Sequence, residues 1–211
     1  MTQLSEISQK LQMGNAKGVI ALVEAALGEG IPAQDILQNG LLDGMNVIGE
    51  KFKKNEVFVP EVLMSARAMK QGIELLKPHL TGEGTQSVGK VCIGTVRGDL
   101  HDIGKNLVKI MLEGKGFEVI DLGTDVAPET FIESAIENKC DIICCSALLT
   151  TTMPVMKEVI EKAKEAGIRD QVKIMVGGAP VNEEFAKQIG ADAYTLDAAS
   201  AAETASAFCK A

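Results

Sequence analysis

The stretch "KVCIGTVRGDLHDIGKNLVKIMLEGKGFEVIDLG", residues 90–123, decides the fold because it passes from a strand pattern to a helix pattern and back. Both ends are short, nearly all-apolar runs, whereas residues 103–115 repeat apolar side chains at helical spacing. Two buried strands joined by a helix form the unit from which parallel sheets are built. The stretch therefore predicts an α/β domain.

The same alternation continues to the end of the chain. Strand patterns occur at "DIICCSALL" (141–149), "VKIMVGG" (172–178) and "DAYTL" (192–196), and helix patterns at "PETFIESAIEN" (128–138), "MPVMKEVIEKAKEAG" (153–167), "NEEFAKQIG" (182–190) and the C-terminal residues. We expect a Rossmann-like, flavodoxin-like doubly wound sheet of five parallel strands in the order 2-1-3-4-5. The dinucleotide fingerprint GxGxxG and the phosphate loop GxxxxGK[ST] are both absent after its first strand.

The first 80 residues show helix patterns only. A short helix near residues 3–12 precedes "GVIALVEAALGEG" (18–30), "AQDILQNGLLDGMNVIGEKFKK" (33–54) and "PEVLMSARAMKQGIELLKPHL" (60–80), all with apolar residues at helical spacing. These patterns predict a four-helix bundle over residues 1–80. The glycine-rich "TGEGTQSVG" (81–89) is typical of a linker, so the second domain would span residues 90–211.

The composition excludes several classes of protein. The 211 residues are 46% hydrophobic and 24% charged, as in globular domains, and the net charge of −8 opposes binding to nucleic acid or to an anionic membrane surface. The sequence contains no run of 18 apolar residues, and it starts as a polar helix. Five cysteines without a CxxC pair fit a reducing compartment. We therefore expect a cytoplasmic protein without nucleic-acid or membrane partners.

Asp99 and His101 follow the first predicted strand, at the sheet edge where ligands of such folds bind. An imidazole there can ligate a metal, and a carboxylate on its other nitrogen would fix its tautomer. The alternative for these two residues is a helix-capping aspartate and an incidental surface histidine.

Two further strand ends carry unusual residues. The third predicted strand ends among the hydroxyl groups of Ser146, Thr150, Thr151 and Thr152, and the fourth ends in Gly177 and Gly178. Capping and a turn could account for either one separately. Three specialised strand ends on one edge indicate a binding site.

The spacing of these residues resembles a known signature. Asp99, His101 and Gly104, then Ser146 and Leu148, then Gly177 and Gly178 are similar to the DxHxxG, SxL and GG motifs of cobalamin-binding domains. The first domain resembles the helical cap of methionine synthase and of the corrinoid proteins of methanogen and acetogen methyltransferases, with "FVPEVLMSARAMK" (58–70) matching its last helix. The resemblance implies cobalamin or a related corrinoid, held base-off with the protein histidine on cobalt.

The resemblance also assigns roles to residues. His101 would be the lower ligand of cobalt, Asp99 would bind the second ring nitrogen, and Thr152 would continue the relay where methionine synthase has a serine. Gly104 would let the nucleotide tail of the cofactor pass. The other residues expected to contact the cofactor are Asp102, Ile103, Ser146, Leu148, Thr150, Gly177, Gly178 and Tyr194, and for Tyr194 packing at the strand end is the open alternative.

The helical cap would protect the methyl group on cobalt. Phe58 and Val62 lie one helical turn apart and are candidates for this apolar cover. A place in the core of the bundle is the alternative for both.

The implied function is that of a methyl carrier in the methylcobalamin form. The resemblance implies a cobalt(I)/methyl-cobalt(III) cycle, in which the cofactor would accept a methyl group from a donor and yield it to an acceptor, with His101 as a ligand of the methylated form. A (β/α)₈ barrel needs about 250 residues, so the donor and acceptor sites would lie on partners. The expected partners are a substrate-specific methyltransferase barrel protein, an acceptor methyltransferase that uses tetrahydrofolate or a thiol, and a reductive activator. Without partner subunits the chain is not expected to be catalytic.

Two other functions use related domains. A cobalamin-dependent sensor or regulator shares the two-domain arrangement without methyl transfer, but such proteins usually add a basic DNA-binding or signalling domain. A subunit of a carbon-skeleton mutase would have the cobalamin domain without the bundle. Methyl carriage is the reading that the sequence favours.

Overall fold

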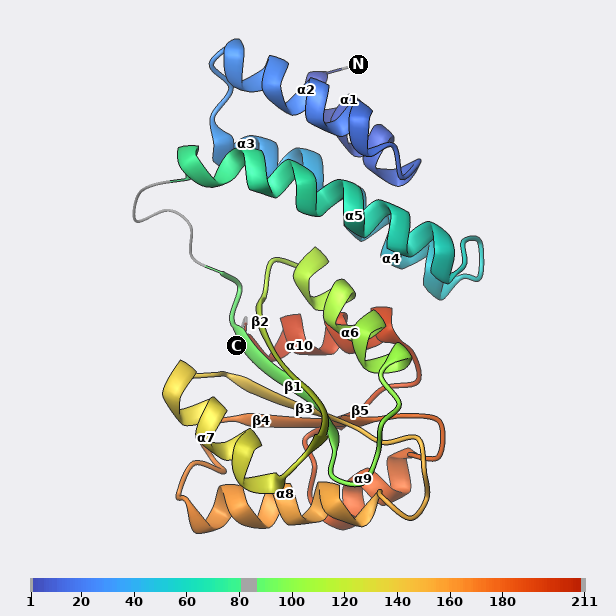
Figure 1. The fold of residues 1–211 in the computed structure, drawn as a ribbon, viewed down its shortest axis with the longest axis vertical. Helices are drawn as coiled ribbons and strands as arrows, with labels where there is room; N and C mark the ends of the chain where they lie inside the picture. The colour runs from blue at the N-terminus through green and yellow to red at the C-terminus, as the bar shows by residue number, and fades with distance from the viewer. Residues whose placement is uncertain (1, 81–86, 210–211) are drawn as a thin grey trace. The chain divides into compact units, whose positions relative to one another are not determined.

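The computed structural model describes residues 2–80 and 87–209 (Figure 1). The chain divides into two compact units, residues 1–86 and 87–211. The predicted linker at 81–89 lies across this division, and its residues 81–86 are outside the described part of the chain. Among the described residues, no helix is long and apolar enough to cross a membrane.

The first unit is helical, as predicted. Its elements are α1 (Gln3–Gln12), α2 (Ala16–Gly28), α3 (Ala33–Ile36), the π-helical η1 (Leu37–Leu42), α4 (Asp43–Lys53), α5 (Val59–Leu76) and the 3₁₀-helical η2 (Lys77–His79). The third predicted helix is thus three consecutive segments, α3, η1 and α4, because its middle turns follow π geometry. Its apolar periodicity did not reveal this change.

Helix capping and close packing account for the shape of this unit. The side chains of Thr2 and Asn15 accept N–H groups in the first turns of α1 and α2. In α5, Gly72 lies against Leu41 of η1, where an added Cβ would come within 2.9 Å of the leucine side chain. The absence of a side chain at residue 72 therefore allows α5 and η1 to approach closely.

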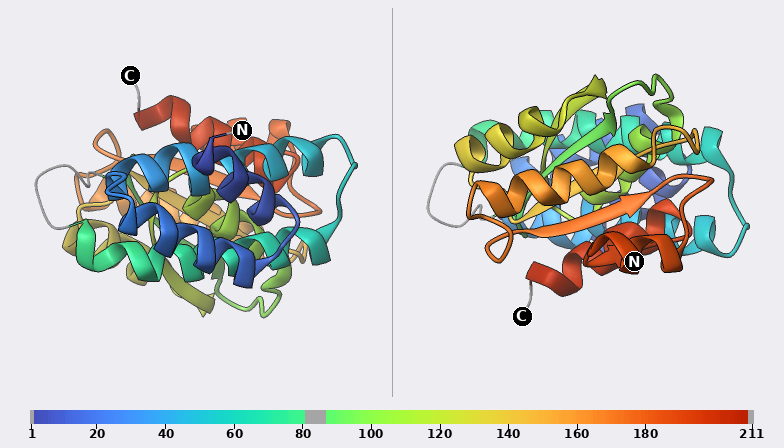
Figure 2. Two further views of the ribbon diagram at one scale, coloured as in Figure 1. Left: turned by 90° about the horizontal axis from the view of Figure 1, so that it is seen from above. Right: turned by 90° about the horizontal axis from the view of Figure 1, so that it is seen from below.

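The second unit is a five-stranded parallel sheet in the order β2-β1-β3-β4-β5, which confirms the predicted architecture. Its elements are β1 (Lys90–Val96), α6 (Ile103–Gly114), β2 (Glu118–Val126), α7 (Pro128–Asn138), β3 (Ile142–Ser146), α8 (Pro154–Glu165), β4 (Lys173–Gly177), α9 (Glu183–Ile189), β5 (Ala193–Tyr194) and α10 (Ala198–Cys209). Helices α6 and α10 cover one face and α7 and α8 the other; the right-hand view of Figure 2 looks toward the α8 side.

Three strands show the largest differences from the prediction. β3 ends at Ser146, three residues early, because the N–H groups of Leu148 and Leu149 donate to the Asp99 carboxylate instead of to a neighbouring strand. β2 continues to Val126, three residues beyond the predicted end, and β5 has only two residues.

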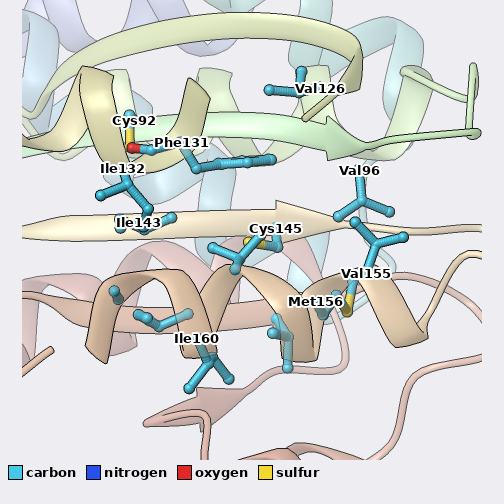
Figure 3. Packing of buried hydrophobic residues seen from close by; sticks show 14 of the residues in the cluster. Cys92, Val96, Val126, Phe131, Ile132, Ile143, Cys145, Val155, Met156 and Ile160 are labelled. Atoms are coloured by element: carbon cyan, nitrogen blue, oxygen red, sulfur yellow. The ribbon is translucent and has the colours of Figure 1, made fainter. Parts of the chain in front are cut away.

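The core between the sheet and α7 and α8 is apolar and tightly packed (Figure 3). Phe131 of α7 is fully buried over β1, where a Cβ on Gly94 would lie 2.8 Å from its ring. Four of the five free cysteines are buried. Burial raises the pKa of the Cys144 thiol to about 12, so this thiol stays protonated at neutral pH. These thiols act as small apolar side chains.

An ion pair ties α6 to β2. The buried Lys105 ammonium lies 2.5 Å from one oxygen of Asp121, and Lys109 lies 3.1 Å from the other. Burial acts to raise the pKa of Asp121, but hydrogen bonds from Lys105, the Gly123 N–H and Lys109 lower it to about 2. The pair anchors the first turn of α6, which contains Gly104.

Candidate functional site

The candidate site is built on the turn that joins β1 to α6, at the carboxyl ends of the strands. Nδ1 of His101 lies 2.7 Å from Oδ1 of Asp99, whose side chain is fully buried, while 52% of the histidine side chain is exposed. A hydrogen bond to an ionised carboxylate requires the ring proton on Nδ1, which leaves the lone pair on Nε2. The ring is therefore prepared to bind a metal through Nε2.

Asp99 is held by donors from two strand ends. Its Oδ1 also accepts the His101 N–H at 3.1 Å, and its Oδ2 accepts the N–H groups of Leu148 at 2.7 Å and Leu149 at 3.1 Å and the Thr152 hydroxyl at 2.9 Å. Burial acts to raise the pKa of Asp99, but these hydrogen bonds, that of the His101 ring foremost, hold it well below its usual range. Asp99 is therefore an anion that orients the imidazole.

The capping alternative for Asp99 does not match this geometry. Helix α6 begins at Ile103 and has Asp102 at its N-cap position. The contacts of the Asp99 side chain are with the turn and with residues 148, 149 and 152, not with the first turn of α6.

Thr152 contacts the Asp99 carboxylate, as its predicted place in a relay requires. The residue is buried, and its Oγ1 lies 2.9 Å both from Oδ2 of Asp99 and from the carbonyl oxygen of Leu149. One hydroxyl proton serves only one of these acceptors at a time. The structure thus brings His101 and Thr152 into contact with different oxygens of Asp99, with the extra methyl group of threonine accommodated.

Two residues that hold the same turn were not predicted from the sequence. The hydroxyl of Thr95, fully buried in β1, donates to the His101 carbonyl at 2.8 Å. Asp125, near the end of β2, accepts the Gly98 N–H at 2.7 Å and donates its own N–H to the Asp99 carbonyl at 3.0 Å. A threonine in an otherwise apolar strand was a signal for the first. Asp125 lay beyond the predicted end of its strand.

The three predicted glycines have different surroundings. A Cβ on Gly104 or Gly177 would meet nothing within 4 Å, so open space lies beside both. A Cβ on Gly178 would lie 1.8 Å from the Ala147 carbonyl oxygen, and the φ angle of Gly178 is +129°. Gly178 is therefore required by the packing of β3 against β4, whereas Gly104 and Gly177 leave room for a ligand.

Exposed apolar side chains lie near the histidine in sequence and in the loop after β3. Leu100 is 73% and Ile103 77% exposed, and Leu148 is also exposed. Exposed leucine and isoleucine side chains beside a free imidazole nitrogen suit a ligand that is both apolar and metal-bearing. Leu100 was not among the predicted residues.

The remaining predicted residues are placed as follows. Ser146 ends β3 opposite Gly177 of β4, and Thr150 is exposed in the loop after it. Tyr194 packs against the apolar core, which favours the packing alternative, and Asp102 accepts a hydrogen bond from Asn106.

The two predicted cap residues belong to the first unit. Phe58 precedes α5 and is 63% exposed, whereas Val62, in the first turns of α5, is fully buried. A shared role for the two as an apolar cover stays a prediction.

The donor set bears on the kind of metal that would fit. Within residues 2–80 and 87–209, no group of three or more His, Cys, Asp or Glu side chains could hold a metal ion. A single imidazole suits a metal whose other ligands come from a macrocycle, as in haem proteins with one axial histidine. With the space beside Gly104 and Gly177, the residues present fit a corrinoid.

Comparisons with known proteins agree with this fit. Residues 89–206 and residues 3–77 each match a family model described as a B12 binding domain. The chain is 44% identical over 208 residues to a corrinoid protein of Desulfitobacterium hafniense, covering 97% of this chain and 96% of the relative. It is 49% identical over 175 residues to trimethylamine corrinoid protein 1 of Methanosarcina acetivorans, covering 82% and 81% of the two chains.

A solved structure has a similar fold. The methanol:cobalamin methyltransferase complex of Methanosarcina barkeri contains a chain that matches with a TM-score of 0.90 and 33% identity, covering 99% of this chain and 80% of that one.

Proposed function

The chain belongs to the family of B12-binding corrinoid methyl-carrier proteins, and from this premise we propose that it carries a methyl group between two methyltransferases on a corrinoid bound base-off through His101. The observation that carries the proposal is the imidazole whose Nδ1 is fixed by a buried carboxylate and whose Nε2 is free. When bound, the corrinoid supplies a cobalt centre that accepts a methyl group and yields it again.

The residues of the turn would tune this centre. Asp99 keeps the proton on Nδ1 and so directs Nε2 toward the metal, and its charge makes the ring a stronger donor. Thr152 stabilises the carboxylate through its hydroxyl.

The neighbouring residues would hold the rest of the cofactor. Gly104 and Gly177 face open space and would admit the nucleotide tail. The other proposed contacts are Asp102, Ile103, Ser146, Leu148, Thr150, Gly178 and Tyr194, with Phe58 and Val62 as the proposed cover of the methyl group.

The proposed partners follow from the relatives. Because one similar chain was solved in a methanol:cobalamin methyltransferase complex and others are methylamine corrinoid proteins, we expect a substrate-specific methyltransferase as donor. An acceptor methyltransferase and a reductive activator complete the proposed system. These similarities favour a carrier over a sensor, and a cytoplasmic location stays a prediction.

The coordination is tested by electron paramagnetic resonance of the cobalt(II) form reconstituted with ¹⁵N-labelled protein. We expect the superhyperfine splitting to change from the ¹⁴N to the ¹⁵N pattern, and His101→Ala to abolish it. A splitting pattern that is the same with labelled and unlabelled protein would assign the nitrogen to the cofactor and refute His101 as the ligand.

A further inference from the structure

Asp125 has a backbone conformation that is unusual for a residue with a side chain. Its φ angle is +55°, in the left-handed region. Within the described residues, two other non-glycine residues have positive φ angles, Asn55 and Lys139, and both lie directly after helices, where this conformation is ordinary. Asp125 lies in a strand, so a helix end does not account for it.

The register of β2 explains how Asp125 reaches the turn after β1. Gly94 pairs with Gly123, but Val96 pairs with Val126, so β2 contains one residue more than β1 over this interval. An extra residue of this kind redirects the chain locally. Here it places Asp125 beside Gly98 and Asp99.

Asp125 contacts the backbone of the turn at Gly98 and at Asp99. Its carboxylate accepts the Gly98 N–H at 2.7 Å, and its own N–H donates to the Asp99 carbonyl at 3.0 Å. The Thr95 hydroxyl secures the His101 carbonyl two residues later. The backbone that carries the histidine is thus fixed from both β1 and β2.

We propose that Asp125 is a positioning residue for the metal ligand: by fixing the Gly98 and Asp99 peptides, it holds His101 in its ligating position before the corrinoid binds. This inference rests on the proposed function. Ordering a backbone segment costs conformational entropy. Since the turn is ordered already by Asp125, binding does not have to supply that cost, and the affinity of His101 for cobalt is higher.

Two substitutions separate the hydrogen bond from the backbone conformation. Asp125→Gly keeps the positive φ angle and removes the acceptor of the Gly98 N–H. Asp125→Asn also tolerates this φ angle and keeps an acceptor oxygen, but without the charge. Lys139→Gly is the control, because it makes the same change at another left-handed residue, between α7 and β3 at the opposite edge of the sheet.

The probe is aquacobinamide, a corrinoid without the nucleotide tail, whose binding depends more heavily on the histidine. We expect its dissociation constant, measured by visible-spectrum titration of the full chain, to rise about tenfold in Asp125→Gly and about two- to threefold in Asp125→Asn. The thermal unfolding midpoints of the apoproteins should stay close to that of the wild type, and Lys139→Gly should bind as the wild type does.

The outcomes are distinguishable. If the wild type binds cobinamide but the complex, reduced to cobalt(II), shows no ¹⁵N splitting from the protein, the proposed function fails, and this inference fails with it. If the wild type shows that splitting but the dissociation constant of Asp125→Gly for cobinamide equals that of the wild type, only the positioning role is refuted. Should Asp125→Gly not fold, an unchanged dissociation constant in Asp125→Asn overturns the role.

Discussion

Replacing Asp99 by asparagine should move the ring proton of His101 from Nδ1 to Nε2, the nitrogen proposed to bind cobalt. The carboxylate presents one oxygen to the His101 N–H and ring and the other to Leu148, Leu149 and Thr152. An amide has one oxygen for these two sets of donors. If the NH₂ group of the amide faces Leu148 and Leu149, the N–H groups of both residues lose their acceptor. If the NH₂ group faces His101, only the backbone N–H of His101 loses its acceptor.

The second orientation is therefore favoured. A buried donor without an acceptor costs about 1–3 kcal/mol, so the amide should face His101 by roughly that margin. The NH₂ group then donates to Nδ1, which forces the ring proton onto Nε2. We expect Asp99→Asn to lower the free energy of unfolding of the apoprotein by about 1–3 kcal/mol and to weaken coordination of cobalt about 10–100-fold.

Denaturant unfolding of the apoprotein measures the first effect, and the ¹⁵N splitting of the cobalt(II) form measures the second. Asp170→Asn is the control, because it removes the same charge at an exposed position between α8 and β4. Thr152→Val should shift both quantities in the same direction but less, since it removes one donor of the carboxylate. Retention of wild-type stability and splitting in Asp99→Asn would refute the orienting role of Asp99.

Three further predictions concern other parts of the chain. Gly104→Ala should leave the apoprotein at least as stable as the wild type, since its Cβ meets nothing, but should weaken corrinoid binding. Gly178→Ala should lower the free energy of unfolding by more than about 3 kcal/mol, because its Cβ would overlap the Ala147 carbonyl. Unfolding curves measure the stability of both variants, and corrinoid titrations measure their binding. Because the pKa of Asp121 is lowered to about 2, its ion pair should stabilise the fold above about pH 4 and lose this effect as the pH falls toward 2. Unfolding at pH 7 should show that Asp121→Asn, which leaves Lys105 buried without its closest partner, costs more than Lys105→Met. Finally, residues 87–211 alone should bind corrinoid, while Phe58→Ala in the full chain should speed photolysis of the methylated form; unchanged photolysis would exclude Phe58 from the cover.

Most of the fold could be predicted from the sequence. The strands of the sheet are short apolar runs and the helices show apolar residues at helical spacing, and both signals are local. The order of the strands followed from the rules for parallel sheets. The π-helical turns at Leu37–Leu42 could not be predicted, because an apolar pattern is compatible with both helical geometries.

The site was predicted less evenly. His101 and Asp99 stood out as a polar pair after a buried strand, and Thr152 as one of several hydroxyl residues. Val62 shows where prediction from spacing fails. Its spacing from Phe58 suggested a shared role, yet Val62 is buried and Phe58 is exposed. Helical spacing places two residues on one face, but it does not say what covers that face.

The sequence by itself determined the helices, the strands and the turn that carries the histidine, because each depends on neighbouring residues, and the rules for parallel sheets then gave the order of the strands. Only the tertiary structure decided how the turn is held. The bonds from Leu148, Leu149 and Thr152 to Asp99 join residues 49, 50 and 53 positions apart. The bond from the Gly98 N–H to Asp125 spans 27 positions and depends on the extra residue that β2 contains between Gly123 and Val126. Such contacts form only once the carboxyl ends of β1, β2 and β3 lie side by side, since pairing of strands, not proximity in the chain, brings their polar groups together.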